Sequence, residues 1–538
     1  MTDYYYDDPV EEPVLKRKNP KSILAAVLLL FAGGLFINTT LASNINISTG
    51  GNIEFGQGMS LTTACSGSTP LTVTPASSFV NSSGSGAFYF NSVTISGIPS
   101  GCDGADFQIS AYDSLTSTAL PLFGVYGDNK SVATVWNNYG FFQQGFQSPG
   151  TVVSSVTGAF TVTFKSPVAL SSNAARLTLQ STGHKDWAEA SISTMQGHTC
   201  ALLNTGTVKC WGSNSDGQLG DGTTTNRLTP VTVTGLGSGV VAISAGASHT
   251  CAVLVTGAVK CWGNNQFGKL GDGTKTSSSI PVAVSGLSSG VSAIAAGANH
   301  TCALLRTGGV KCWGDAGKTG DGSGLERVTP VDVSGLSSGV SVITAGFYHS
   351  CALLKSGAVK CWGSADRGAT GDGGGGDAPG SAISNLSPGV VAIASGERHN
   401  CALLTTGAVR CWGWNDLNQV KPTAGDVSTP VDIAGLGSGV TGVSAGGQTS
   451  CALFSTGAAK CWGNNGSGQF GDGTTTSSSS PVSVSGLSFA VAMVNSQNHA
   501  CALLNTYVIK CWGSNGSGQL GDNSTTQRLT PVSVTGIP

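Results

Sequence analysis

The sequence predicts an all-β protein whose C-terminal part is built from repeats. Seven segments share the pattern Cys, nine residues, Cys-Trp-Gly, and their first cysteines stand at 200, 251, 302, 351, 401, 451 and 501, a period of 49–51 residues. A fixed period of this size indicates a solenoid, a propeller or an array. Within each repeat, short β-branched or apolar runs are separated by Gly, Asn, Asp and Ser clusters, which predicts four strands joined by turns. Gly and Thr are too frequent for a helical repeat.

The chain begins with a basic segment and one apolar run. Residues 1–21 end in a cluster of Lys and Arg, and residues 23–37 are uninterrupted apolar. The positive flank predicts that residues 1–21 are cytoplasmic and that the rest of the chain lies on the far side of the membrane. Residues 22–43 are then either a signal peptide, cleaved after the small-x-small motif that ends at Ala42, or a membrane anchor. Both alternatives predict a secreted or cell-surface protein.

The segment before the repeats is a separate module. Residues 44–185 contain alternating strand-like runs split by Gly, Ser and Pro turns, which predicts an antiparallel β-sandwich. Cys65 and Cys102 are its only cysteines. We expect them to form one disulfide, because the export signal places this module in an oxidising compartment.

The central hairpin of each repeat sets two cysteines opposite each other. If residues 204–206 form a three-residue loop, the third position requires Gly, and Cys200 then faces Cys210 directly. Gly fills this position in every repeat except the last, which has Tyr507. Opposed cysteines at this separation are compatible with a disulfide. The spacing differs from that of structural zinc sites, and reduced thiols buried in the core are the remaining alternative.

The register predicts one disulfide in each repeat. The predicted pairs are Cys200–Cys210, Cys251–Cys261, Cys302–Cys312, Cys351–Cys361, Cys401–Cys411, Cys451–Cys461 and Cys501–Cys511.

The repeat motif resembles that of the regulator of chromosome condensation family. It consists of a Gly, then His-Thr or His-Ser, Ala-Leu, Trp-Gly and Gly-Gln-Leu-Gly-Asp-Gly, as in GASHTCAVLVTGAVKCWGNNQFGKLGDGT at 246–274. Members of this family form seven-bladed β-propellers. The resemblance therefore implies that residues 186–538 form a closed ring of seven blades, in an exported, bacterial-type version to which the cysteine pairs are added. The fourth repeat departs from the pattern because it lacks the Pro-Val strand.

Three residue types recur once per repeat and are candidates for chemistry. The histidines come from separate blades around a wide circle without accompanying carboxylates, which favours hydrogen bonding over metal binding, and the resemblance implies that each belongs to the framework of its own blade. The tryptophans after the second cysteines suit packing between blades. The aspartates in Gly-Asp turns lack the ligand spacing of calcium sites, which favours hydrogen bonds within the turn. We expect no metal and no cofactor.

The two residues before each repeat histidine vary more than the rest of the motif. Equivalent loops of a propeller share one face, and loops on a rigid scaffold commonly carry recognition. Aromatic residues and Arg are enriched in interface hot spots. We therefore predict a contact patch on blades four and five that contains Phe347, Tyr348, Glu397, Arg398 and Trp414.

Composition excludes several functions. The net charge is −2, only 10% of residues are charged, and no basic block follows residue 21, which argues against a nucleic-acid partner. No motif of a hydrolase, metalloprotease or P-loop enzyme is present, so the chain is expected not to be an enzyme. We predict a non-catalytic binding or adhesion protein, secreted or at the cell surface, whose partner is an extracellular protein or glycan. The alternatives are an exported enzyme inhibitor with a similar propeller and, by resemblance, a nucleotide exchange factor for a small GTPase, which needs a cytosolic partner.

Overall fold

A computed structural model describes two parts of the chain. The first comprises short segments at 45–47, 53–54, 71–80, 87–99, 102, 105–112, 119–125, 128–138, 141–144, 151–156, 159–164, 167 and 176–183. The second is residues 190–537 without 373–376, 378, 381, 387–388 and 424. The predicted segments 1–21 and 22–43 lie outside these residues. Within the residues described, no helix is both long enough and apolar enough to cross a bilayer.

The first part consists of two five-stranded antiparallel sheets and a short ribbon. One sheet has the order β1 (Ile45–Ile47), β3 (Leu71–Val80), β4 (Ala87–Ser96), β11 (Ala159–Phe164), β10 (Thr151–Val156). The other has the order β2 (Ile53–Glu54), β12 (Arg176–Gly183), β5 (Ala105–Tyr112), β8 (Val132–Asn138), β9 (Phe141–Gln144). The ribbon is β6 (Phe123–Val125) with β7 (Asp128–Lys130).

Both sheets contribute to one hydrophobic core. Phe107 of β5 and Phe160 of β11 lie 5.4 Å apart between ring centroids, and both side chains are buried in the same cluster. In β11, alternate residues are buried, as a strand with one core-facing side requires. Cys102 is buried in this core. Cys65 lies outside the described residues, so the Cys65–Cys102 bridge stays a prediction.

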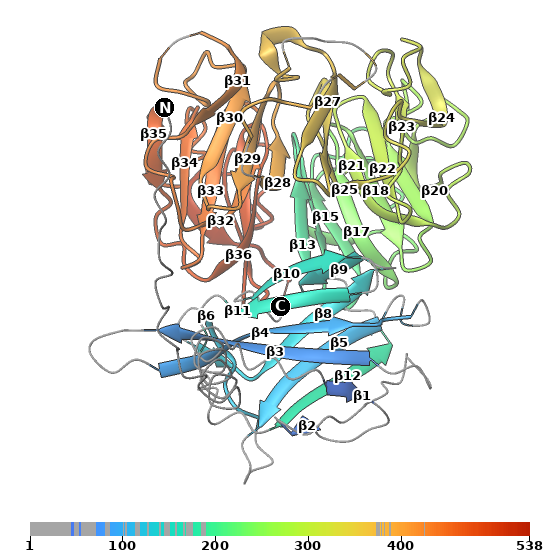
Figure 1. Ribbon diagram of the computed structural model, residues 1–538. Helices are drawn as coiled ribbons and strands as arrows, with labels where there is room; N and C mark the ends of the chain where they lie inside the picture. Colours follow the sequence, from blue (N-terminus) through green and yellow to red (C-terminus); the bar gives the residue numbers. More distant parts are fainter. Residues whose placement is uncertain are drawn as a thin grey trace, which may run out of the picture.

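The second part is a ring of seven antiparallel sheets, the blades (Figure 1). Blades 1 to 3 are β13 (Ser191–Thr194), β14 (His198–Leu202), β15 (Val208–Gly212), β16 (Arg227–Thr232); β17 (Val240–Ala245), β18 (His249–Leu254), β19 (Val259–Gly263), β20 (Ser278–Ala283); and β21 (Val291–Ala296), β22 (His300–Leu305), β23 (Val310–Gly314), β24 (Arg327–Asp332). Blade 4 is β25 (Val340–Ala345), β26 (His349–Leu354), β27 (Val359–Gly363), followed by the 3₁₀ turn η2 (Asp366–Gly368). Blades 5 to 7 are β28 (Val390–Ser395), β29 (His399–Leu404), β30 (Val409–Gly413), β31 (Val427–Asp432); β32 (Val440–Ala445), β33 (Thr449–Phe454), β34 (Ala459–Gly463), β35 (Ser478–Ser483); and β36 (Ala490–Asn495), β37 (His499–Leu504), β38 (Ile509–Gly513), β39 (Arg528–Ser533).

Four strands per blade were expected, and six blades have them. Blade 4 has three strands among its described residues, where the sequence lacks the Pro-Val strand.

The predicted hairpin register is confirmed in every blade. Cys200 of β14 pairs with Cys210 of β15, and the loop closes with a hydrogen bond from the Gly206 N–H to the Leu203 carbonyl at 2.9 Å. Gly206 has φ 76°, and Tyr507 takes the same left-handed conformation at φ 67°. The seventh repeat thus keeps the turn despite the side-chain strain. All seven predicted cysteine pairs are disulfide-bonded in the structure.

The hydrophobic cores lie between neighbouring blades, and we call each such contact a seam. At the seam of blades 1 and 2, Trp262 packs against Leu202 and Val208, and its indole N–H donates to the Gln218 carbonyl at 2.9 Å. Six further tryptophans are equally buried. The predicted inter-blade role of the tryptophans is therefore confirmed.

The histidines also bridge blades, which corrects the expectation that each serves its own blade. His198 Nε2 lies 2.9 Å from the hydroxyl of Thr250 in the next blade. That hydroxyl donates its proton to the Gln218 carbonyl at 2.9 Å, so His198 must be the donor to Thr250. The resulting relay runs from imidazole to hydroxyl to carbonyl. This relay uses residues from two neighbouring blades. It therefore cannot be recognised from the sequence of a single repeat.

Side chains, not exchanged strands, close the ring. Trp211 of blade 1 donates to the Gln519 carbonyl of blade 7 at 2.9 Å, and His499 of blade 7 lies 2.8 Å from the Thr199 hydroxyl. Blade 7 and blade 1 share one core cluster, and β36 lies beside β13 (Figure 1). Each blade is built from consecutive strands of the chain. The last seam thus repeats the chemistry of the others.

Three seams depart from this pattern. At the seam of blades 4 and 5, His349 lies 2.8 Å from the side-chain oxygen of Asn400, an amide that donates to the Ala369 carbonyl in place of a hydroxyl. At the seam of blades 6 and 7, Thr449 replaces the histidine and Ala500 replaces its hydroxyl partner, so both ends of the link are missing together. At the seam of blades 3 and 4, the buried Trp362 N–H has no hydrogen-bond partner among the described residues. The third repeat has a shortened loop there, with Lys318 at the position that Gln218 has in the first repeat.

The Gly-Asp turns are held by their own side chains, as predicted. Asp221 accepts hydrogen bonds from the backbone N–H and the hydroxyl of Thr223 at 3.0 and 2.7 Å, and from Arg227. Burial acts to raise the pKa of Asp221, but the hydrogen bonds from Thr223 and Arg227 outweigh it and lower that pKa. Asn214, fully buried, donates to Asp221 from across the loop. These bonds give the aspartates a structural role.

Candidate functional site

The variable residues before the repeat histidines lie in equivalent loops, but they point in different directions. Phe347 is only 6% exposed and packs in a cluster with Met195 and Ala298 near the axis of the ring. Phe347 therefore adds little to the exposed surface, and its predicted binding role stays a prediction. Both residues lie in a bend, where Phe347 is buried and its neighbour Tyr348 is half-buried.

Tyr348 and Arg398 meet across the seam of blades 4 and 5. The Arg398 guanidinium lies 4.6 Å from the centroid of the Tyr348 ring, a cation–π contact. Arg398 also lies 3.5 Å from an Asp366 carboxylate oxygen of η2. Because Asp366 is 73% exposed, this ion pair adds little stability. Tyr348 and Arg398 therefore place an aromatic ring and a cation side by side at the surface.

Trp414 lies next to this pair. Its backbone N–H donates to the Arg398 carbonyl at 2.8 Å, and the Arg367 guanidinium lies 5.8 Å from its ring centroid. Arg367 also lies 3.4 Å from carboxylate oxygens of Asp416 and Asp426. We call Tyr348, Asp366, Arg367, Arg398 and Trp414 the blade 4–5 patch.

Sequence reasoning missed Asp366 and Arg367. Both belong to η2, which stands where other repeats have uncharged or singly charged turn residues. Arg367 has φ 65°, so the turn holds a non-glycine residue in the left-handed region. The sequence signal that could have identified them is the pair of adjacent opposite charges in a turn that is otherwise rich in Gly and Ser.

Glu397 stands apart from the patch. Its backbone N–H donates to the Gly446 carbonyl at 2.9 Å, across the seam of blades 5 and 6. Burial raises the pKa of the Glu397 carboxyl, and the Arg398 charge opposes this rise. Its binding role stays a prediction, as do those of Tyr348, Arg398 and Trp414.

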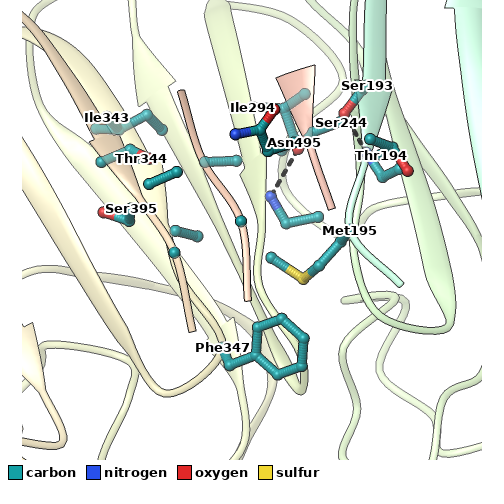
Figure 2. Close-up of a pocket in the computed structure, with 17 residues that line it drawn as sticks. Ser193, Thr194, Met195, Ser244, Ile294, Ile343, Thr344, Phe347, Ser395 and Asn495 are labelled. Atoms are coloured by element: carbon teal, nitrogen blue, oxygen red, sulfur yellow. Dashed lines mark hydrogen bonds between the residues drawn. The ribbon is translucent and has the colours of Figure 1, made fainter. Parts of the chain in front are cut away.

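A cavity of about 200 Å³ occupies the axis of the ring. The innermost strands of the blades line it with small or hydroxylated residues, and Figure 2 shows Met195 and Phe347 beyond the ends of these strands. Asn495, the last residue of β36, is also in its wall. The residues that line it carry no ionisable side chain.

A sequence model of the RCC1-like domain matches residues 169–494, which is more than half of the chain. The chain belongs to the RCC1-like domain family. The resemblance seen in the repeats is thereby confirmed.

Curated relatives share the repeats of this RCC1-like chain over short stretches. It is 36% identical over 126 residues to the ultraviolet-B receptor UVR8 of Arabidopsis thaliana, a match that covers 23% of this chain and 29% of UVR8. It is 35% identical over 120 residues to the probable E3 ubiquitin-protein ligase HERC4 of Homo sapiens, covering 22% of this chain and 11% of HERC4. The chain thus spans less than a third of the length of these relatives.

Solved structures share the fold of this RCC1-like propeller. Prp20p from Saccharomyces cerevisiae, studied for its binding to Gsp1p and histones, matches with a TM-score of 0.55 at 21% identity, over 64% of this chain and 87% of Prp20p. Human WBSCR16 matches with a TM-score of 0.55 at 21% identity, over 61% of this chain and 94% of WBSCR16. At these identities the likeness concerns the fold alone.

The repeat histidines of the RCC1-like ring are held neutral. Burial lowers the pKa of His198 and His349 to about 4, and that of His300, His399 and His499 to about 3. Burial also lowers the pKa of His249 well below its ordinary value. Among the described residues, no group of three or more His, Cys, Asp or Glu side chains is arranged to hold a metal ion.

Proposed function

We propose that this RCC1-like propeller is a non-catalytic binding protein, secreted or held at the cell surface, that binds a protein through the blade 4–5 patch. The observation that carries the proposal is the contact of Arg398 with Tyr348 at 4.6 Å, beside Trp414 and Arg367. Tyr, Trp and Arg dominate the energetic centres of protein interfaces. We favour a protein over a glycan because the patch combines cations with exposed carboxylates.

Export is part of this proposal. The seven disulfides suit an oxidising compartment. In this scheme residues 22–43 act as signal peptide or single-pass anchor, and residues 44–185 form a β-sandwich module that carries the ring.

Exchange-factor activity on a small GTPase is the second candidate, because the chain is RCC1-like and Prp20p was studied with Gsp1p. It requires the ring in the cytosol. An exported enzyme inhibitor with a similar propeller would bind its target outside the cell. Of these two functions, only exchange-factor activity conflicts with export. Protease treatment of intact cells decides between them: we expect the ring to be digested. A ring that stays protected until lysis would favour exchange-factor activity.

The patch is tested with the full chain as bait in crosslinking pull-downs from surface-protein extracts, followed by affinity measurement on each captured protein. We expect the double variant Tyr348→Ala with Arg398→Ala to weaken binding of a true partner. The expected loss of binding free energy is about 2 kcal/mol or more for each hot spot, which raises Kd roughly 30-fold. The matched control is Gln448→Ala with Asn498→Ala, at the equivalent loop positions of blades 6 and 7. A partner that binds both double variants equally well would show that the patch is wrong.

A further inference from the structure

Two aromatic residues stand where the equivalent positions of other blades have glycine. Phe489, in the loop that leads into blade 7, has φ 60°, and Tyr507, in the β37–β38 hairpin, has φ 67°. The glycines at these two positions in other blades also have positive φ, and they are Gly239, Gly290, Gly339, Gly389 and Gly439 for Phe489, and Gly206, Gly257, Gly308, Gly357, Gly407 and Gly457 for Tyr507. A left-handed backbone is unfavourable for a residue with a bulky side chain. Both aromatic residues therefore cost free energy that glycine does not, and such strain is found most often at functional sites.

The two strained residues lie close together at one end of the ring. The backbone N–H of Asn505, two residues before Tyr507 in the same hairpin, donates to the Phe489 carbonyl at 2.9 Å. The Phe489 side chain is 46% exposed, and Tyr507 is half-buried. Segments 485–491 and 504–508 contain no charged residue. The strained backbone thus presents two aromatic side chains on a neutral surface, and we call Phe489 and Tyr507 the blade 7 aromatic pair.

The chain enters the ring beside this pair. Tyr507 packs against the hydrophobic cluster that contains Ala190, the residue just before the first strand of blade 1. The first part of the chain, β1 to β12, which we call the two-sheet part, ends at Gly183, so only residues 184–189 connect it to Ala190. Seven steps of an extended chain span at most about 25 Å. In Figure 1 the two-sheet part lies below the ring, on the side of the labels of β13 and β36. The short connection therefore holds the two-sheet part near the blade 7 aromatic pair.

We propose that the blade 7 aromatic pair is the docking site of the two-sheet part of the same chain. Burying two aromatic side chains removes apolar surface from water, which offsets the backbone strain that glycine would avoid. A small contact is sufficient because a short connection gives the docked part a high effective concentration.

This docking leaves the blade 4–5 patch accessible. The patch residues Tyr348 and Arg398 lie in loops that join the first and second strands of a blade, whereas Phe489 lies in a loop that joins a fourth strand to a first strand. Because the strands of a blade are antiparallel, these two kinds of loop lie at opposite ends of the ring. The inference does not rest on the proposed function.

The test measures how fast trypsin cleaves the full chain after Lys185, in the connection between the two parts. We expect Phe489→Gly to raise this rate at least fivefold, because an undocked two-sheet part no longer restrains the connection. Adding Tyr507→Gly should raise the rate further, and Phe489→Tyr, which keeps an aromatic ring, should be cleaved at the parent rate. Leu325→Gly is the matched control: it removes a 59% exposed apolar side chain from a loop at the opposite end of the ring and should leave the rate unchanged.

Thermal unfolding of each variant separates loss of the contact from loss of the fold. Phe489→Gly should unfold cooperatively at a temperature close to that of the parent, because other blades have glycine at this position. Equal cleavage rates for the parent and for Phe489→Gly would overturn the proposal. So would light scattering that shows a dimer of the parent which Phe489→Gly converts to monomers, because the aromatic pair would then bind a second copy of the chain.

Discussion

At the scale of single residues, one hydroxyl links the histidine of blade 1 to the neighbouring blade. The Thr250 hydroxyl accepts a hydrogen bond from the His198 N–H and donates one to the Gln218 carbonyl, which also accepts from the Trp262 N–H. The same carbonyl arrangement recurs at the seam of blades 2 and 3, where Lys269 supplies the carbonyl to Thr301 and Trp313. Since all these atoms are buried, each link in the relay has a stability cost if broken.

We predict that Thr250→Val lowers the free energy of unfolding by about 1–3 kcal/mol, because it leaves the His198 N–H unsatisfied at nearly constant volume. Denaturant unfolding measures the change. Ala500→Val, at the equivalent position of blade 7 where no histidine faces it, is the control and should lack this hydrogen-bond penalty. Equal losses for the two variants would mean that shape, not the relay, sets the effect.

At the scale of elements, the hairpin and the seam are the two units of stability. The hairpin is local: ten residues separate its cysteines, and its glycine loop sets the register. The seam is not local, because its partners lie about one repeat apart. This difference explains why hairpins are uniform around the ring while the seams of blades 3 and 4, of blades 4 and 5 and of blades 6 and 7 are not.

The disulfides give a prediction for the hairpins. Non-reducing peptide mapping of protein purified without reductant should recover seven links, each within one repeat. Cys401→Ala with Cys411→Ala should lower stability by about 2–3 kcal/mol, since the bridge closes a short loop in the unfolded chain. Free thiols, or links between repeats, would be inconsistent with the hairpin register.

The incomplete seam of blades 6 and 7 gives a second prediction at this scale. Thr449→His with Ala500→Thr should restore the relay and make the double variant more stable than the two single changes predict, with a coupling of about 0.5–3 kcal/mol. Neither change alone supplies both partners. A double-mutant cycle in denaturant measures the coupling, and a value near zero would show that this seam cannot form the link.

At the scale of the whole molecule, six neutral histidines connect the ring. Their folded-state pKa values lie near 3 or 4, or well below 6.5, because burial disfavours the imidazolium. The unfolded chain takes up protons on these residues below about pH 6.5, whereas the folded ring does not. Protonation therefore favours unfolding between about pH 6.5 and pH 4.

We predict that stability already falls slightly from pH 8 to pH 7, because burial lowers the pKa of Lys269 to about 8, and falls steeply below pH 6.5, by up to roughly 1.4 kcal/mol per pH unit for each histidine. Denaturant midpoints at pH 7.5, 6.0 and 5.0 test this. His399→Gln should reduce the slope of stability against pH. The control is His184→Gln, outside the repeats, which should leave that slope unchanged. Equal midpoints at pH 7.5 and 5.0 would contradict the neutral, buried state of the ring.

The sequence by itself determined the repeat number, the hairpin register and the cysteine pairs, because these depend on contacts within about ten residues. It also indicated that the tryptophans pack between blades. Only the tertiary structure decided that the histidines bridge blades and that Phe347 turns to the axis of the ring. It also decided that Tyr348 contacts Arg398 across a seam. Asp366 and Arg367 join the same patch through the fold. It alone showed that the indole N–H of Trp211 donates to the Gln519 carbonyl and so closes the ring. These contacts join residues from one repeat to more than 300 positions apart, and direction toward or away from the axis depends on the ring as a whole.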